Sequence, residues 1–94
     1  MANAVVLDVS ELEPPEPLAL TLESAARLQP GYYLRMRHRR FPCLLFDDLG
    51  KQGFRHLVRG GHDIACEVLI WREGDLEAAR AAEATAKELP QWRE

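Results

Sequence analysis

The spacing of apolar residues changes repeatedly along this chain, and the changes fall at prolines and glycines. Residues 5–9 are mostly β-branched, which is typical of a strand, and the proline-rich residues 14–17 end that strand. From Leu18 to Leu28 apolar residues recur every three or four positions. This spacing predicts an amphipathic helix that begins near Pro17.

The next segment alternates strictly between two faces, after a turn at Pro30-Gly31 that favours type II geometry. One face carries Leu34, Met36 and His38. The other face carries Tyr33, Arg35, Arg37 and Arg39. The alternation predicts a second strand with a basic outer face. Pro42 then suits the start of a second helix, which ends near Gly50.

Residues 54–71 are predicted to form a hairpin, and the side chains favour one register. A two-residue loop at Gly60-Gly61 mixes apolar and charged residues on one face. A three-residue loop that includes His62 separates them through these pairs: Phe54 with Val68, Arg55 with Glu67, Val58 with Ile64 and Arg59 with Asp63. We therefore expect the three-residue loop, with a glycine in the left-handed conformation. His56 then lies opposite Cys66 and packs in the core.

Residues 75–88 contain no helix breaker and predict a third helix. The complete order, β-α-β-α-β-β and a helix, predicts an α/β two-layer sandwich of the α+β type. Its mixed four-stranded sheet carries the first two helices on one face. The other face would expose Leu69 and Trp71, so we expect the third helix to cover it with Leu76 and small alanines, while its glutamates approach the arginine row. It can dock on its own chain or on a neighbour, which would give a homodimer.

Length and composition limit the class of protein. Ninety-four residues suit one domain with a modest core, and 47% apolar residues argue against disorder. No apolar run approaches the ~20 residues of a membrane span, and no basic-then-apolar leader is found. The two cysteines, Cys43 and Cys66, have neither zinc nor disulfide spacing. We expect a soluble, cytoplasmic protein with reduced thiols, no metal, no cofactor and no membrane contact.

The net charge of −3 conceals three blocks of opposite sign. Residues 1–26 carry five acids and no lysine or arginine, residues 27–62 carry eight bases and two acids, and residues 63–94 carry eight acids and four bases. Such a chain neutralises itself on folding or presents its basic middle to an anionic ligand. The arginine row beside Tyr32 and Tyr33 can follow phosphates, but the acidic balance argues against nucleic acid as a partner.

Several segments, in this order, resemble one protein family. They are LDVSELEPPEP at residues 7–17, LQPGYYLRM at residues 28–36, the HRRFP turn, LLFDDLGKQGF at residues 44–54 and the closing hairpin. Over about residues 5–72 the chain is identified as a member of the family called domain of unknown function 2249, which is related to the TusA/SirA-like sulfur carriers. The resemblance implies the same βαβαββ fold and no known activity. It divides the chain into a TusA-like domain at residues 1–72 and a C-terminal helical extension at residues 73–94.

The resemblance also bears on sulfur chemistry. In the TusA-like carriers the first strand-to-helix turn has the motif Cys-Pro-x-Pro, and its cysteine carries the persulfide sulfur. This chain keeps Pro15 and Pro17 but has Pro14 where that cysteine would stand. Sulfur transfer needs a thiolate, which proline cannot supply. The resemblance therefore implies the rigid helix entrance of a sulfur carrier without its nucleophile.

The two strand-to-helix turns form the candidate site. If the first two strands are parallel, both turns meet at the edge where open α/β sheets bind ligands. Two helix N-termini at that edge favour an anion. The side chains brought there are Glu13, Glu16, His38, Arg39, Arg40 and Cys43. They form either a small pocket for an anionic group or a metal, or a surface in which Glu13 and Glu16 pair with Arg39 and Arg40.

The thiol and imidazole groups also have structural interpretations. Cys43 beside arginines at a helix start can act as a thiolate, but beside two leucines it is typical of a small buried apolar residue, and we adopt that interpretation. His38 continues an apolar row, which is typical of a partly buried histidine, and His62 belongs to a turn. Three histidines and two cysteines without close spacing do not predict a metal site.

The sequence holds the parts of a ligand site without a complete catalytic set. We therefore interpret the chain as a non-enzymatic ligand-binding or protein-interaction module of TusA-like fold, whose partner is a small anion, another protein or a second copy. Two alternatives remain. One is a thiol-dependent sulfur carrier or redox protein that uses Cys43, and the other is an accessory domain that binds an anion or a metal.

Overall fold

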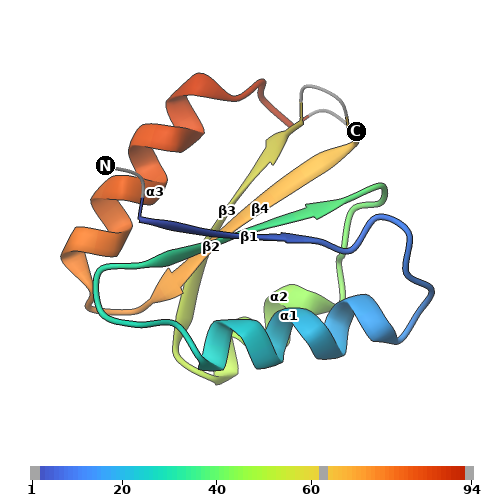
Figure 1. Cartoon of the computed structure of the whole chain (residues 1–94), viewed down its shortest axis with the longest axis horizontal. Helices are drawn as coiled ribbons and strands as arrows, with labels where there is room; N and C mark the ends of the chain where they lie inside the picture. The colour runs from blue at the N-terminus through green and yellow to red at the C-terminus, as the bar shows by residue number, and fades with distance from the viewer. Residues whose placement is uncertain (1–2, 62–63, 93–94) are drawn as a thin grey trace.

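The computed structural model describes residues 3–61 and 64–92, which form four strands and three helices (Figure 1). Their order is β1 (Ala4–Asp8), α1 (Glu16–Ala26), β2 (Tyr33–His38), α2 (Leu45–Lys51), β3 (Phe54–Gly60), β4 (Cys66–Arg72) and α3 (Leu76–Glu88). The predicted order of elements is confirmed. The strands form one mixed sheet in the spatial order β1-β2-β4-β3, in which β1 and β2 are parallel and the other neighbours are antiparallel.

The helices lie on both faces of the sheet. Figure 1 shows α1 and α2 on one face and α3 on the other, and each face has its own apolar cluster. The protein is thus a small α+β fold, in which α3 adds a third layer to the predicted two-layer sandwich. None of the described helices is long and apolar enough to cross a membrane.

The core under α1 and α2 follows the alternation of β2. Leu34, Met36 and His38 are buried, as predicted. Leu34 and Met36 pack with Val68 and Ile70 of β4, because Met36 pairs with Val68 and Leu34 with Ile70 in the sheet register. A period of two along β2 therefore supplies one wall of this core.

The connection from α1 to β2 has the predicted turn chemistry. The N–H of Tyr32 donates to the carbonyl of Gln29 at 3.0 Å, with Pro30 and Gly31 at the two central positions. Gly31 has a φ of +83°, the left-handed value that a type II turn requires at its third residue. The Pro30-Gly31 pair therefore fixes where the chain leaves α1 and enters the sheet.

α3 covers the other face of the sheet within the same chain. The helix contributes Ala78, Ala82 and Ala86, which pack against Tyr33, Leu69 and Trp71. Asp75 fixes its start, because one carboxylate oxygen accepts the N–H of Ala78 at 3.1 Å and the other accepts the N–H of Gly31 at 2.8 Å. Small residues at every fourth position let the helix lie close to the sheet, as the sequence led us to expect.

Two expectations about α3 are wrong. Leu76 is 68% exposed, because the buried stripe of α3 falls on the alanines and Leu76 lies outside it. Among the described residues, the ion pairs of the arginine row are those of Arg35 and Arg37 with Glu67 of β4 and that of Arg39 with Glu13, and not pairs with glutamates of α3. Glu67 is 3% exposed, and its carboxylate lies 2.8 Å from Nη2 of Arg35 and 4.0 Å from Nε of Arg37. The register explains this, since Arg37 and Glu67 are direct cross-strand partners.

The predicted register of the β3–β4 hairpin is also wrong. Each residue of β3 pairs four positions further along β4 than expected: Phe54 faces Arg72, Arg55 faces Trp71, Val58 faces Val68 and Arg59 faces Glu67. Residues 61–65 therefore connect the strands, of which His62 and Asp63 lie outside the described residues. Neither Gly60 nor Gly61 has a positive φ. Because the shift is even, each side chain keeps its predicted face, although His56 now lies opposite Ile70.

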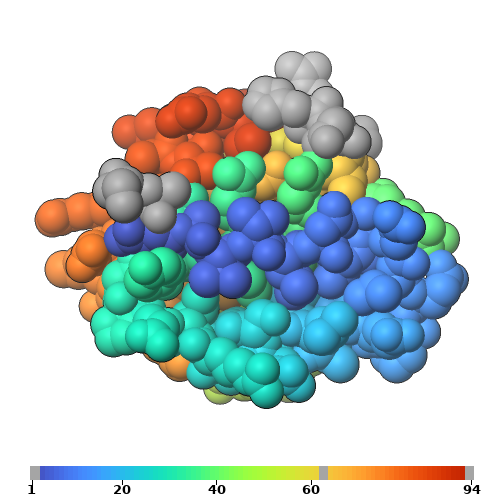
Figure 2. Space-filling model, in the orientation of Figure 1, coloured from blue at the N-terminus to red at the C-terminus, as the bar shows by residue number. Residues whose placement is uncertain are grey.

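The two edges of the sheet differ in how they are covered. At the β3 edge the N–H of Gly60 donates to the carbonyl of Pro90 at 2.8 Å, and Arg59 forms an isolated antiparallel bridge with Gln91. The C-terminal segment thus covers the end of β3. At the opposite edge β1 lies along the molecular surface (Figure 2). The exposed fractions of Val5 and Val6 in this strand are 43% and 59%.

Candidate functional site

The predicted juxtaposition of the two strand-to-helix turns follows from the parallel pairing of β1 and β2. The carboxyl ends of both strands lie at the same end of the sheet. The N–H of Val9, just beyond β1, donates to the carbonyl of Arg37 at 3.0 Å. The turn of residues 9–15 and the turn of residues 39–44 therefore lie beside each other, at the right of Figure 1. Open α/β sheets hold ligands at this end, just outside the carboxyl ends of their strands.

A shallow pocket of about 170 Å³ opens between these turns. It is lined by Pro14, Leu18, His38, Arg40, Phe41, Pro42, Cys43, Leu44 and Leu45. Most of its wall is carbon, and its polar groups are one imidazole, one guanidinium and one thiol. Three of the predicted site residues, His38, Arg40 and Cys43, are thus brought together.

His38 is held at the floor of the pocket as a neutral imidazole. Only 8% of the residue is exposed, and its Nδ1 accepts a long hydrogen bond of 3.4 Å from the N–H of Arg40. Burial lowers the pKa of His38, and the positive charges of Arg39 and Arg40 lower it further, against a smaller opposing effect of Asp8. With Nδ1 as acceptor, the ring carries its proton on Nε2, which makes that atom a hydrogen-bond donor.

The arginines of the second turn differ in their partners. Arg39 forms an ion pair and a hydrogen bond with Glu13 across the two turns. Arg40 is exposed, lines the pocket and forms no ion pair with any described residue. The self-neutralised surface that the sequence suggested is therefore realised for Glu13 and Arg39 only. Glu16 is exposed and does not line the pocket.

The two cysteines have opposite environments, and the expected burial of Cys43 is wrong. Cys43 is exposed, because α2 begins at Leu45 rather than at Pro42 and leaves Cys43 in the turn. Cys66 is buried, and its Sγ donates to the carbonyl of Arg40 at 3.1 Å. Burial, with a further contribution from Glu67, raises the pKa of the Cys66 thiol to about 11. Cys43 is therefore the accessible thiol of the two, whereas Cys66 is buried and hydrogen-bonds to the turn that contains Arg40.

The remaining histidines lie outside this pocket. His56 stacks on Phe46 of α2, with ring centroids 4.3 Å apart, and burial lowers its pKa. It is a packing residue, as predicted. His62 lies outside the described residues. Among the described residues no group of three His, Cys, Asp or Glu side chains is placed to hold a metal ion.

The sequence interpretation missed the apolar half of the site. Phe41 stands in a turn between arginines and a proline, and it retains 39% of its exposure while Leu44 retains 78%. Large apolar residues exposed in a turn are a signal for binding that could have been taken from the HRRFPCLL segment. Phe41 also stacks on Trp92, 51 positions further along the chain, and no local sequence pattern predicts that contact.

The comparisons with known proteins place the chain in a family. The model of the family described as "Uncharacterized conserved protein (DUF2249)" matches residues 6–72. This chain belongs to the DUF2249 family. Neither a curated protein nor a solved structure matches it. The family assignment from the sequence is confirmed, whereas the relation to the TusA/SirA-like sulfur carriers stays a prediction.

The DUF2249 match covers the whole candidate pocket. Every lining residue from Pro14 to Leu45 falls within residues 6–72. α3 and the C-terminal segment with Trp92 lie beyond the matched region. The pocket is thus a feature of the DUF2249 part of the chain, to which the later residues add contacts.

Proposed function

We propose that this DUF2249 chain is a non-enzymatic binding module whose pocket takes a small organic anion with a compact apolar group. The observation that supports this most is Arg40, a cation at a pocket of carbon atoms that has no acidic partner among the described residues. A carboxylate can approach its guanidinium, and the Nε2–H of His38 offers a second donor. The apolar part of the ligand then contacts Leu18, Phe41 and Leu44.

The volume of the pocket sets the size of that apolar group. An apolar cavity of about 150 Å³ accommodates a benzene molecule. The pocket between the turns measures about 170 Å³. Benzoate, with one ring and one carboxylate, is therefore the simplest probe that matches both the volume and the charge.

Binding is favoured over catalysis by the contacts of the polar groups. A catalytic thiol or imidazole is usually activated by a hydrogen-bonded base and an orienting carboxylate. No carboxylate among the described residues hydrogen-bonds to His38, whose Nδ1 accepts the N–H of Arg40. The imidazole is therefore arranged to recognise a ligand and not to activate Cys43.

A titration of the chain with benzoate, followed by amide chemical shifts in NMR, tests the proposal. We expect the largest shifts at residues 38–45 and saturable binding. Arg40→Gln should weaken it by about fivefold to tenfold, since a charge-assisted hydrogen bond at a partly exposed site contributes about 1 kcal/mol. Arg27→Gln is the matched control, because Arg27 lies at the other end of α1 and pairs with Glu23. No shifts at residues 38–45, or equal weakening by both variants, would refute the proposal.

A second candidate function rests on the exposure of Cys43. An exposed thiol that lines a pocket beside Arg40 and His38 suits a thiol-dependent sulfur carrier or redox protein. In a TusA-like relationship this cysteine, from the second turn, would replace the one that Pro14 displaces from the first. Two unlinked thiols also suit a reducing compartment such as the cytoplasm.

Thiol chemistry separates the two candidates. Incubation with a persulfide donor, followed by mass spectrometry of the intact chain, should add one sulfur atom to Cys43 if the chain carries sulfur. Cys43→Ser should abolish that mass shift, and Cys66→Ser should leave it. If the wild-type chain gains no sulfur while it binds benzoate, the binding module is the function and the thiol alternative falls.

A further inference from the structure

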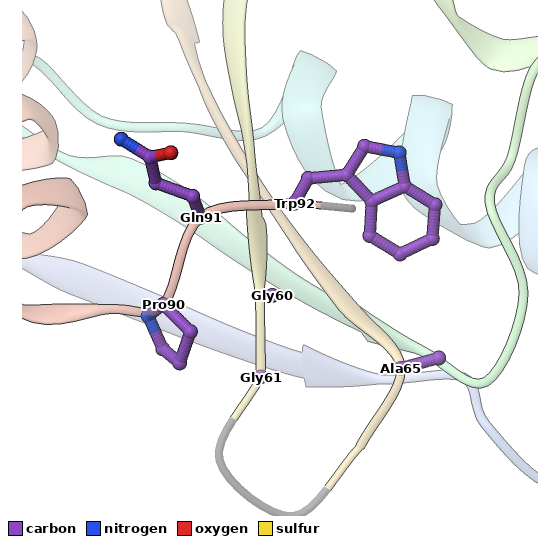
Figure 3. A pocket seen from close by; sticks show the side chains of 6 residues that line it. All are labelled: Gly60, Gly61, Ala65, Pro90, Gln91 and Trp92. Atoms are coloured by element: carbon purple, nitrogen blue, oxygen red, sulfur yellow. The ribbon is translucent and has the colours of Figure 1, made fainter. Parts of the chain in front are cut away.

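The C-terminal segment of the chain is held against the same end of the sheet as the candidate site. Figure 3 shows residues 90–92 passing over the end of β3, with the side chains of Gln91 and Trp92 on opposite sides. The segment is fixed by the hydrogen bond from Gly60 to Pro90 and by the backbone bridge between Arg59 and Gln91. A Cβ on Gly60 would lie 3.1 Å from the carbonyl oxygen of Gln91, so the two backbones touch. The position of Trp92 is thus set by backbone contacts.

The ring of Trp92 belongs to a row of neighbouring aromatic rings that includes Phe41 of the site. It lies on Phe41 with centroids 5.1 Å apart and an interplanar angle of 20°. Phe41 contacts Phe46 at 5.2 Å, and Phe46 stacks on His56 at 4.3 Å. Phe41 is therefore sandwiched between α2 and the C-terminal segment, although it belongs to an exposed turn.

The two rings of the stacked pair Phe41 and Trp92 line two different hollows. Phe41 lines the pocket of about 170 Å³ described above. Trp92 lines a larger hollow of about 570 Å³, whose other lining residues are Gly60, Gly61, Ala65, Pro90 and Gln91 (Figure 3). Each ring of the stacked pair therefore lines one of the two hollows.

We propose that Trp92 is a positioning residue of the DUF2249 site. Its ring holds Phe41 in the wall of the pocket and closes the pocket towards the larger hollow, so that it sets the largest apolar group the site accepts. The inference rests on the proposed function and assigns a role in it to a residue that lies outside the family match. The contact between Trp92 and Phe41 lies within the chain, so the positioning can be measured separately from ligand binding.

Removal of the Trp92 ring should have two opposite effects on ligands. Benzoate should bind more weakly by about twofold to tenfold, because an aromatic pair contributes that much and Phe41 loses it. A two-ring anion such as 2-naphthoate should lose less or gain, because in this proposal the pocket then opens towards the larger hollow. The ratio of the two affinities, and not their absolute values, is therefore the signature of this role.

The test compares wild type with Trp92→Ala, Trp92→Phe and Gln91→Ala, each checked for an unchanged circular dichroism spectrum. Trp92→Phe keeps a ring for stacking, and Gln91→Ala changes a side chain in the same segment without touching the backbone bridge. Benzoate and 2-naphthoate affinities are measured by calorimetry. The ligand-free readout is the rate at which iodoacetamide alkylates Cys43, whose N–H donates to the carbonyl of Phe41 at 3.0 Å.

The inference predicts that Trp92→Ala changes both the affinity ratio and the Cys43 rate by at least about twofold, and that Trp92→Phe restores both. It is overturned if Trp92→Ala leaves both unchanged, or if Gln91→Ala has the same effect. If wild type does not bind benzoate yet the Cys43 rate responds to Trp92→Ala alone, the positioning stands and the proposed function falls. If benzoate binds and Trp92→Ala alters neither readout, the proposed function stands and this inference falls.

Discussion

The buried carboxylate of Glu67 provides the most demanding test of the contacts between β2 and β4. Glu67→Gln keeps the shape of the side chain and removes its charge. In the native chain that carboxylate is 3% exposed and faces Arg35 and Arg37, with an additional 2.9 Å hydrogen bond from Nε of Arg35. The substitution leaves the guanidinium groups of Arg35 and Arg37 without this negative partner.

The expected cost follows from the burial of the three groups. Breaking a buried ion pair by removal of one partner costs about 3–5 kcal/mol. The side chains of Arg35 and Arg37 retain 28% and 24% of their exposure, so water compensates for part of the loss. We therefore expect the free energy of unfolding to fall by about 2–3 kcal/mol, which lowers the thermal midpoint of a domain this size by roughly 10–20 °C.

Urea unfolding followed by circular dichroism measures this change. Glu23→Gln is the matched control, because Glu23 and Arg27 form an exposed pair at 3.5 Å that should contribute no more than about 0.5 kcal/mol. The double variant Arg35→Met, Glu67→Leu should be more stable than Glu67→Gln, since apolar groups of similar volume replace buried ion pairs with little cost. A loss below about 1 kcal/mol for Glu67→Gln, or one equal to that of Glu23→Gln, would show that Glu67 is not what stabilises the two arginines.

Three further predictions concern the fold. Deletion of residues 74–94 uncovers Tyr33, Leu69 and Trp71 of the sheet, and the burial of each contributes about 1.5–3 kcal/mol. Calorimetry of the shortened chain should therefore show no cooperative unfolding. An unchanged thermal midpoint would contradict the docking of α3. Asp75→Ala removes the acceptors of the Ala78 and Gly31 N–H groups and should cost about 1–2 kcal/mol in urea unfolding. Asp75→Asn keeps one acceptor oxygen, so it should retain the bond to Ala78, lose the bond to Gly31 and have an intermediate cost. Burial lowers the pKa values of His38 and His56 below 6.5, so the unfolded chain takes up protons first and stability is complete above about pH 6.5. It should decline as the pH falls from there through the folded-state values, and a flat urea midpoint between pH 8 and pH 5 would oppose this.

The local patterns of the sequence determined the elements and their faces. The alternation of β2 predicted that Leu34, Met36 and His38 are buried, because a strand sends successive side chains to opposite faces whatever its partners are. The Pro30-Gly31 pair predicted a turn that the φ of +83° at Gly31 confirms. The strand-helix-strand order also predicted that the two turns meet, since parallel strands end at one edge of the sheet.

The pairing of the hairpin was beyond the reach of the same patterns. A register shifted by an even number of residues leaves every side chain on the same face, so the apolar pattern of β3 and β4 cannot tell the two registers apart. The choice is made by long-range contacts. Val58 meets Val68, Arg59 meets the Glu67 that also holds Arg35, and Gly60 receives the C-terminal segment on its backbone.

In the candidate site, too, some features were determined by the sequence and others were decided only by the tertiary structure. The sequence alone determined that His38, Arg40 and Cys43 stand on one strand-to-helix turn, because their separation in the chain is five residues or fewer. Tertiary structure decided which charges are cancelled, pairing Arg39 with Glu13 and leaving Arg40 at the pocket, and it decided that Cys43 is exposed. It also brought Trp92 onto Phe41. A periodic pattern records only which way a side chain points within its own element, whereas these contacts depend on where the folded sheet places the ends of distant segments.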